Sequence, residues 1–220
     1  MNIIIKRFLN LTDMTRHSAQ LRENVADDIV IITKKAEGRI GIAISENFLL
    51  SNFNAAYCNE NDIEISLATN AKFGPYGNIL SIPGATYTML FPMAEDRVKY
   101  YEFIEVFTDI FSKIGNAEFV KNDFVIGDKK LMGCWFNPEK TQISAISSLG
   151  NVSKDIDNIY SDSFRENAGK IMPSDRVLGY NDIAKDKIDI VGMAQLMKEA
   201  FNRLTDIHID KIIEVDGDIE

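Results

Sequence analysis

Residues 122–133 read Asn-Asp-Phe-Val-Ile-Gly-Asp-Lys-Lys-Leu-Met-Gly, and this stretch decides how the rest of the chain is interpreted. The apolar runs at 124–126 and 131–136 are typical of strands, and the Gly-Asp pair between them suits a two-residue type II′ turn. The pattern predicts a tight β-hairpin with Lys129 and Lys130 directly after its turn. Because side chains alternate along a strand, the two lysines are expected to point to opposite faces.

A lysine on a rigid hairpin can serve chemistry as well as solubility. The strand fixes the origin of the side chain, and the long stem delivers a point charge that can neutralise a phosphate. A Lys-Lys pair beside a turn is also an ordinary solvated surface. Only one of Lys129 and Lys130 is needed for a site, and the choice between them depends on which one faces it.

The same stretch resembles the N-D-strand, turn and K-hydrophobic-x-G strand of the lipoate-protein ligase A and biotin-protein ligase superfamily. In that family the catalytic lysine directly precedes the hydrophobic-x-G element, which here implies Lys130, before Leu131-Met132-Gly133. The resemblance implies ATP as cofactor, with Asn122 and Asp123 in its binding site and Asp123 as a ligand of Mg²⁺.

The resemblance covers nearly the whole chain, because its elements come in the family's order. Gly77-Asn78 matches the glycine and asparagine that follow the family's glycine-rich loop, and both are implied to bind the cofactor. A long helix, the lysine hairpin, the stretch at 174–180 and a last helix containing Ala200-Phe201 follow. The implied fold is α+β, a mixed β-sheet with packed helices, over residues 1–205, followed by an acidic tail at 206–220.

One segment departs from the family pattern. Where the family has R-R-x-S-G-G-G-x-V-Y-H-D, residues 64–75 read E-I-S-L-A-T-N-A-K-F-G-P. Glycines let backbone N–H groups approach a phosphate closely, and these glycines are missing together with the arginines. Lys72 is expected to bind the cofactor and can replace lost charge, but it cannot replace the glycines. Either the substrate differs from the family's or adenylation has been lost. We expect the loop at 69–78 to border the same cleft as Lys130.

Composition sets outer limits on function. The chain has 220 residues with a formal net charge of −9, which argues against nonspecific binding to nucleic acid or to an anionic membrane. It contains no apolar run of about eighteen residues, the length a membrane-spanning helix needs. The apolar stretch at its start is too short for a secretory signal, so a cytoplasmic location is expected. Cys58 and Cys134 lie far apart in no metal-binding spacing, and both are expected to be reduced and buried.

Periodicity predicts the remaining elements. An apolar stripe with helical spacing runs through residues 94–114 and includes Phe103, Phe107 and Phe111, which are expected to pack in the core. Residues 29–33 and 39–44 are expected to be strands joined by a short turn, and residues after 210 to be loose. Other helices are expected at 11–24, 46–59, 152–159 and 189–204, other strands at 63–67, 85–91 and 142–148, and an exposed polar segment at 169–177.

An acidic pair, Asp155 and Asp157, invites a metal-site interpretation. It lacks a third ligand or a turn-rich loop of the calcium-binding type, so a metal site is not favoured.

Three functions are compatible with the sequence. The first is an ATP-dependent ligase that activates a lipoate- or octanoate-like acid as its adenylate and transfers it to a lysine of an acyl carrier domain. The second is an ATP-independent octanoyl or lipoyl transferase, for which Cys134 is the cysteine near the site. The third is a non-catalytic protein that uses the same cleft to bind a ligand or partner. Dependence on ATP separates the first two.

Overall fold

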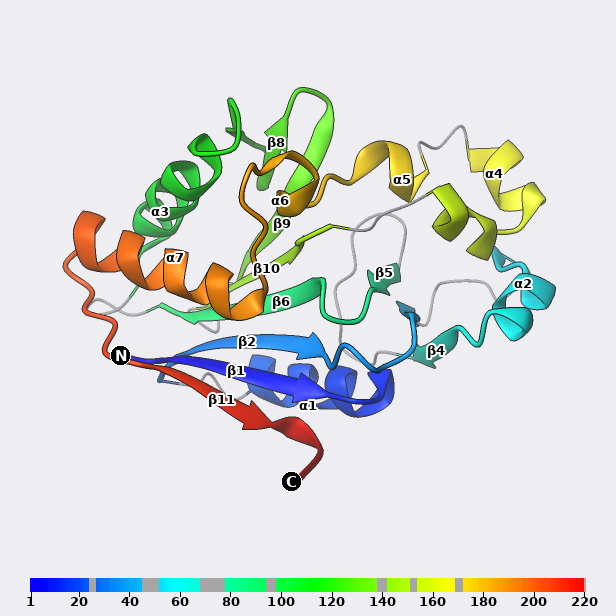
Figure 1. Cartoon of the computed structure of the whole chain (residues 1–220), viewed down its shortest axis with the longest axis horizontal. Helices are drawn as coiled ribbons and strands as arrows, with labels where there is room; N and C mark the ends of the chain where they lie inside the picture. Colours follow the sequence, from blue (N-terminus) through cyan, green and yellow to red (C-terminus); the bar gives the residue numbers. More distant parts are fainter. Residues whose placement is uncertain are drawn as a thin grey trace.

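The computed structural model describes residues 1–23, 27–44, 52–67, 78–93, 98–137, 142–150, 154–168 and 172–219. Strands and helices alternate irregularly along the chain (Figure 1). In chain order they are β1 (Ile3–Phe8), α1 (Leu11–Glu23), β2 (Ile29–Lys34), β3 (Gly41–Ile44), α2 (Ala55–Glu60), β4 (Glu64–Leu67), β5 (Asn78–Ser81), β6 (Thr86–Pro92), α3 (Tyr100–Ser112), β7 (Glu118–Val120), β8 (Asp123–Ile126), β9 (Lys129–Asn137), β10 (Gln142–Ser148), η2 (Lys154–Ile159), α4 (Asp162–Ala168), α5 (Pro173–Arg176), α6 (Tyr180–Ile183), α7 (Ile190–Leu204), β11 (Ile212–Asp216) and η3 (Gly217–Ile219).

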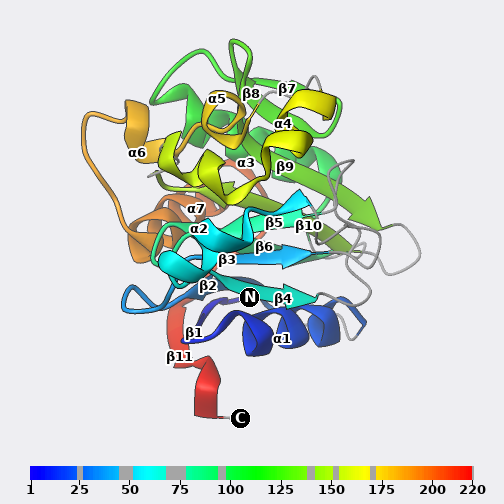
Figure 2. The ribbon, with the colours of Figure 1, turned by 90° about the vertical axis from the view of Figure 1, so that its right-hand side faces the viewer.

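Eight strands form the large sheet, in the order β11-β1-β2-β6-β10-β9-β8-β7. β1 pairs in parallel with both β11 and β2, whereas the pairs from β2 to β7 are antiparallel. A second sheet of three strands, β4-β3-β5, lies beside it (Figure 2). Mixed sheets with helices packed against them confirm the α+β fold that the sequence predicts.

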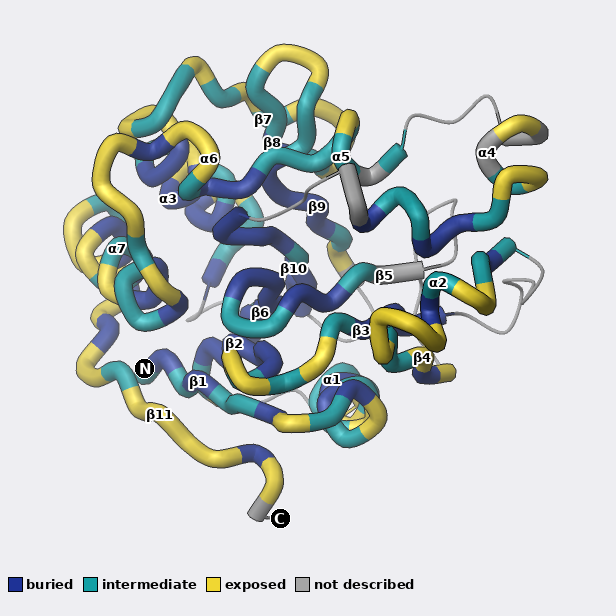
Figure 3. The backbone as a smooth tube through the Cα atoms, turned by 45° about the vertical axis from the view of Figure 1, so that its right-hand side comes forward, coloured by how far each residue is buried: buried dark blue, intermediate teal, exposed yellow. Residues whose placement is uncertain are grey.

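One face of the large sheet is covered by α3 and α7 (Figures 1 and 3). The main core lies between this face and the two helices. Phe103, Phe107 and Phe111 of α3 are fully buried, as predicted, and their rings contact Phe124 of β8. The helix is shorter than the predicted 94–114. Lys99 has an extended backbone and its N–H donates to the Glu102 carboxylate, a cap that fixes the helix start.

The helix α1 packs on the other face of the large sheet (Figure 1). Leu11 and Met14 of α1 pack on Val30 and Ile32 of β2. The strands predicted at 29–33 and 39–44 are β2 and β3, joined by a short connection as predicted, but they do not pair with each other, because β3 pairs with β4 and β5. Both edges of β2 are occupied, by β1 and β6, so β3 has no free edge there to join.

The predicted helix at 46–59 is also shorter, since Asn54 caps α2 by accepting from the Tyr57 N–H. Phe53 is not helical and forms an isolated bridge with Tyr160. Residues 45–51 lie outside the described part of the chain. The short helix predicted at 152–159 is the 3-10 helix η2.

The prediction of a loose C-terminal end is wrong, because β11 extends the large sheet along β1. The acidic residues there have cationic partners: Lys35 contacts Asp216 and Asp218 at 2.8 and 2.6 Å, and Arg7 contacts Glu214 at 2.9 Å. Three ion-paired carboxylates therefore hold the C-terminal segment against the sheet, although its acidic composition alone suggests a solvated tail. No helix of the described chain is long and apolar enough to cross a membrane.

Candidate functional site

The hairpin of residues 123–137 forms as predicted. Ile126 and Lys129 pair across Gly127-Asp128, and Gly127 has φ +62°, the positive value that the first turn residue of a type II′ turn requires. No other residue type adopts this φ as easily as glycine, which has no Cβ. The turn places both lysines at the start of β9.

A β-bulge between β8 and β9 then decides where Lys130 points. Asp123 pairs with Gly133, and Phe124 with Met132, but Val125 pairs with Lys130, so Leu131 is the extra residue of β9. Strict alternation would place Lys130 and Gly133 on opposite faces. The bulge brings Lys130 to the face of Asp123 and Gly133, and bulges commonly re-aim a side chain in this way. We call this the lysine face of the sheet.

On the lysine face, Lys130 Nζ lies 2.7 Å from Asp123 Oδ1, and both side chains are about a quarter exposed, at 27% and 29%. Gly133 makes room for this arrangement. A Cβ at position 133 would lie 2.5 Å from Lys130 Nζ and 2.6 Å from its Cε. The glycine of the K-hydrophobic-x-G pattern therefore has a physical reason here: the ammonium group lies over it.

The backbone of Lys130 is held from a second side. Its carbonyl accepts from the Leu178 N–H at 2.9 Å, and Lys130 forms a parallel bridge with Val177. The predicted exposure of residues 169–177 is therefore wrong for Arg176 and Val177, which are half-buried. Pairing on both sides fixes the lysine's origin and makes it rigid.

The acidic residue Asp157 has a structural role next to this segment. Its carboxylate accepts from the N–H and hydroxyl of Ser174 and so caps α5. Among the described residues no cluster of three His, Cys, Asp or Glu side chains is spaced to hold a metal ion.

Asn122, predicted to bind cofactor, lies in the turn between β7 and β8. Lys121 and Asn122 have φ values of +49° and +70°, and asparagine tolerates this region better than most residues. Its Oδ1 accepts from Tyr100 Oη at 2.9 Å, and its carbonyl accepts from the Cys134 N–H at 2.8 Å. In this arrangement Asn122 ties α3 and β9 to the hairpin.

The loop predicted to border the cleft lies outside the described residues. Lys72 and Gly77 belong to it, and Asn78 is described only as the first residue of β5. Their cofactor-binding roles remain predictions.

Cys134, the candidate nucleophile of a transferase, faces away from Lys130. It follows Gly133 on β9 and packs in the core beneath α3 and α7. Burial, and to a lesser degree the nearby Asp123 charge, raises the pKa of the thiol well above its usual range. A thiolate is the nucleophilic form, so this geometry gives no support to covalent catalysis by Cys134.

This burial leads to a first testable expectation. The native protein should react with a thiol reagent such as a maleimide at neither Cys58 nor Cys134, because both are buried and burial raises the pKa of both thiols. Labelling followed by mass spectrometry measures this. In denaturant both cysteines should react, and rapid labelling of Cys134 in the folded protein would contradict its placement.

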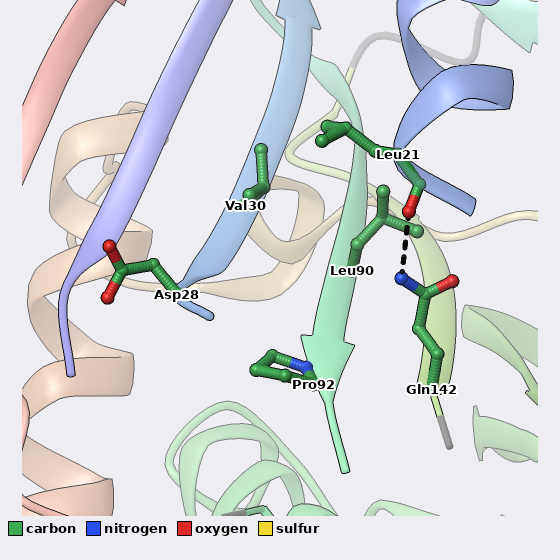
Figure 4. A pocket seen from close by; sticks show the side chains of 6 residues that line it. All are labelled: Leu21, Asp28, Val30, Leu90, Pro92 and Gln142. Atoms are coloured by element: carbon green, nitrogen blue, oxygen red, sulfur yellow. Dashed lines mark hydrogen bonds between the residues drawn. The ribbon is translucent and has the colours of Figure 1, made fainter. Parts of the chain in front are cut away.

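A shallow depression lies at the C-terminal end of α1, between Leu21 and the strands β2, β6 and β10 (Figure 4). It is lined by Leu21, Asp28, Val30, Leu90, Pro92 and Gln142, and it is too shallow to hold a water molecule. Neither Lys130 nor Asp123 lines it. We therefore place the candidate site around Lys130 and Asp123 and not in this depression.

Gly133 supplies the second testable expectation. In Gly133→Ala the new methyl group would displace the flexible end of Lys130 rather than backbone, so the free energy of unfolding should change by less than about 1 kcal/mol. Any activity that depends on Lys130 should fall strongly. Urea unfolding and turnover on the same preparation test this, and full activity in the variant would show that the position of the ammonium group is unimportant.

The chain is similar to known proteins in structure but not in sequence. No family model matches the chain, and no curated protein matches it in sequence. Over 96% of its length the chain is similar to the bi-partite lipoate protein ligase of Thermoplasma acidophilum, with a TM-score of 0.65 at 14% identity, and it covers 86% of that protein. This chain has the fold of the lipoate-protein ligases. The resemblance seen in the sequence is confirmed at this level.

Two further solved structures with this fold hold ligands. One is a lipoate-protein ligase A bound with ATP, with a TM-score of 0.62 at 14% identity. The match covers 96% of the present chain and 88% of that protein. LipL1 of P. falciparum, in complex with lipoate, matches 98% of the chain with a TM-score of 0.65 at 12% identity. The present chain spans 66% of the length of LipL1.

Proposed function

We propose that the protein is an ATP-dependent ligase that activates a carboxylic acid of about octanoate's size as its acyl-adenylate and transfers the acyl group to a lysine of a carrier domain. The observation that supports this most is the Lys130 ammonium group, held over Gly133 and beside Asp123 on the lysine face. The fold is shared with proteins solved with ATP and with lipoate, and with a lipoate protein ligase described together with its E2 lipoyl domain.

In the proposed first step, a carboxylate oxygen of the acid attacks the α-phosphorus of ATP. The new oxygen–phosphorus bond replaces the bond to pyrophosphate, which leaves with its electron pair. Two anions must approach each other, so a cation between them lowers the barrier. Lys130 is positioned for that role. In the second step the amine of a carrier lysine attacks the acyl carbon, AMP leaves, and the amine loses a proton.

Asp123 would orient Lys130 in this mechanism. Its Oδ1 accepts from the ammonium group, which leaves Oδ2 to hold Mg²⁺, and Mg²⁺ commonly binds through one carboxylate together with substrate phosphates. The residue present thus fits the metal that the resemblance implies. The metal would supply further neutralisation of phosphate charge. With ATP as substrate, we propose a cytoplasmic reaction.

A non-catalytic binding protein of the same fold is the second candidate. The observation that favours it is the sequence at 64–75, which lacks the arginines and glycines of the family's loop. The same cleft would then hold a ligand without activating it. A transferase that uses Cys134 is not carried further, because the thiol faces the core.

Calorimetric titration of the purified protein with ATP, octanoate, lipoate and biotin tests the proposal. The ligase function predicts binding of ATP and of at least one acid, and pyrophosphate release when both are present. Binding without pyrophosphate release would favour the second candidate. Failure to bind ATP at all would refute the ligase.

A further inference from the structure

A second cation lies over the lysine face. The guanidinium carbon of Arg22, at the C-terminal end of α1, lies 5.3 Å from the ring centroid of Trp135, the single tryptophan of the sequence. Its Nε is buried and donates to no partner. Among the described residues no carboxylate pairs with Arg22, and burial lowers its pKa.

Trp135 shares a face with Lys130. It is two residues beyond Gly133 on β9, so its side chain projects to the same side of the sheet. The Lys130 ammonium group lies over Gly133, and same-face neighbours on a strand are separated by about 7 Å. One small molecule lying along β9 can therefore contact both cations, with the indole ring between them.

The end of α1 that carries Arg22 is hydrogen-bonded to the sheet. Gln142 Nε2 donates to the Leu21 carbonyl at 3.3 Å and so ties the end of α1 to β10, as Figure 4 shows. Stacking on an indole also orients the planar guanidinium group. A desolvated cation without an anionic partner is unfavourable in a folded protein, and such groups are enriched at ligand sites.

We propose that Arg22 binds a second acidic group at the far end of the acid substrate, so that the substrate is an α,ω-dicarboxylic acid rather than octanoate or lipoate. This rests on the proposed function, which places the reacting carboxylate at Lys130. A purely aliphatic tail would leave the buried Arg22 Nε–H without an acceptor. A carboxylate satisfies them and matches the planar geometry of guanidinium.

The test compares suberate with octanoate, which have the same chain length and differ by one carboxylate. Calorimetric titration of the full chain should show suberate binding roughly tenfold to hundredfold tighter than octanoate, the range expected of a charge-assisted hydrogen bond. In Arg22→Met, which keeps most of the stem that lies on Trp135, this preference should disappear. Arg22→Lys should retain part of it.

Arg16→Met is the matched control, because Arg16 lies on the same helix but is exposed and paired with Asp13 at 3.2 Å. It should bind suberate as the parent protein does. Circular dichroism of all variants separates loss of the contact from loss of the fold. Equal affinity for the two acids in the parent, or an unchanged preference in Arg22→Met, would overturn the inference.

Two other outcomes separate this inference from the proposed function. Suberate binding that depends on Arg22, without pyrophosphate release when ATP is added, would support the acid assignment and refute the ligase. If Arg22→Met instead weakens binding of ATP and leaves suberate unaffected, the cation serves a phosphate and the acid assignment is overturned.

Discussion

Lys130→Ala is expected to reduce acyl-adenylate formation by roughly a hundredfold or more. The variant removes the cation that the proposed mechanism puts between two anions, and loss of one positioned charge-stabilising group typically costs about 3 kcal/mol of activation free energy. Mass spectrometric detection of the adenylate in single-turnover reactions measures the rate directly. The hairpin should persist, since the side chain of Lys130 is partly exposed and its backbone bonds do not depend on it.

Lys129→Ala is the matched control. Lys129 is adjacent on β9, pairs with Ile126 and points to the opposite face, so its removal should leave most of the activity. Equal activity of the parent and both variants would remove Lys130 from the mechanism. Equal loss in both would indicate that the two lysines act through hairpin stability rather than chemistry.

Glu64→Gln is expected to destabilise the protein by about 3–5 kcal/mol, because it leaves a buried ammonium group without its counter-charge. Lys34 is fully buried at the end of β2, and its Nζ contacts Glu64 Oε2 of the small sheet. The other carboxylate oxygen accepts from the Leu11 N–H at 2.6 Å. One carboxylate therefore joins both sheets and the start of α1. Urea unfolding measures the effect.

The double variant Lys34→Met/Glu64→Gln should recover most of the lost stability, because it removes the buried charge and keeps an acceptor for the Leu11 N–H. Arg39→Met provides a surface comparison: Arg39 pairs with Asp62 at 2.6 Å, but both side chains are more than half exposed, so the free energy of unfolding should not change. A Glu64→Gln variant as stable as the parent would show that the pair does not hold the sheets together.

Elements with strong local patterns could be predicted from the sequence. The aromatic stripe at Phe103, Phe107 and Phe111 has helical spacing and is buried as predicted. The Gly127-Asp128 turn has the required conformation, and residues 142–148 form β10 with the predicted bounds. Each of these depends on neighbours within a few residues, which a sequence displays directly.

Features that depend on distant partners could not be predicted in this way. β3 has a strand-like sequence, but the sheet that it joins depends on which strands have an unpaired edge, and both edges of β2 are already paired. β11 is short and acidic, and it is ordered by lysine and arginine side chains that lie far away in the sequence. The first strand, β1, is not among the elements that the sequence pattern predicts, although it pairs on both edges.

The sequence singles out Lys130 and Asp123, whose site roles remain predictions, but the geometry that brings them together could not be predicted from it. The K-hydrophobic-x-G pattern points to Lys130, and Asp123 is its partner. The bulge at Leu131 determines that they share a face. The sequence signal for the close approach of Lys130 to the backbone is Gly133, a glycine inside a strand. Arg22 was missed because α1 and β9 are far apart in sequence, and no local pattern links an arginine to a tryptophan.

The central claim, that the lysine face activates a carboxylic acid with ATP, is tested most directly by ATP–pyrophosphate exchange. The parent protein, given ATP and labelled pyrophosphate, should incorporate label into ATP only when a suitable acid is added, with suberate, octanoate and lipoate tried in turn. Lys130→Ala should lose this exchange and Lys129→Ala should keep it. Acid-dependent exchange that survives in Lys130→Ala, or no exchange with any acid in the folded parent protein, would contradict the account.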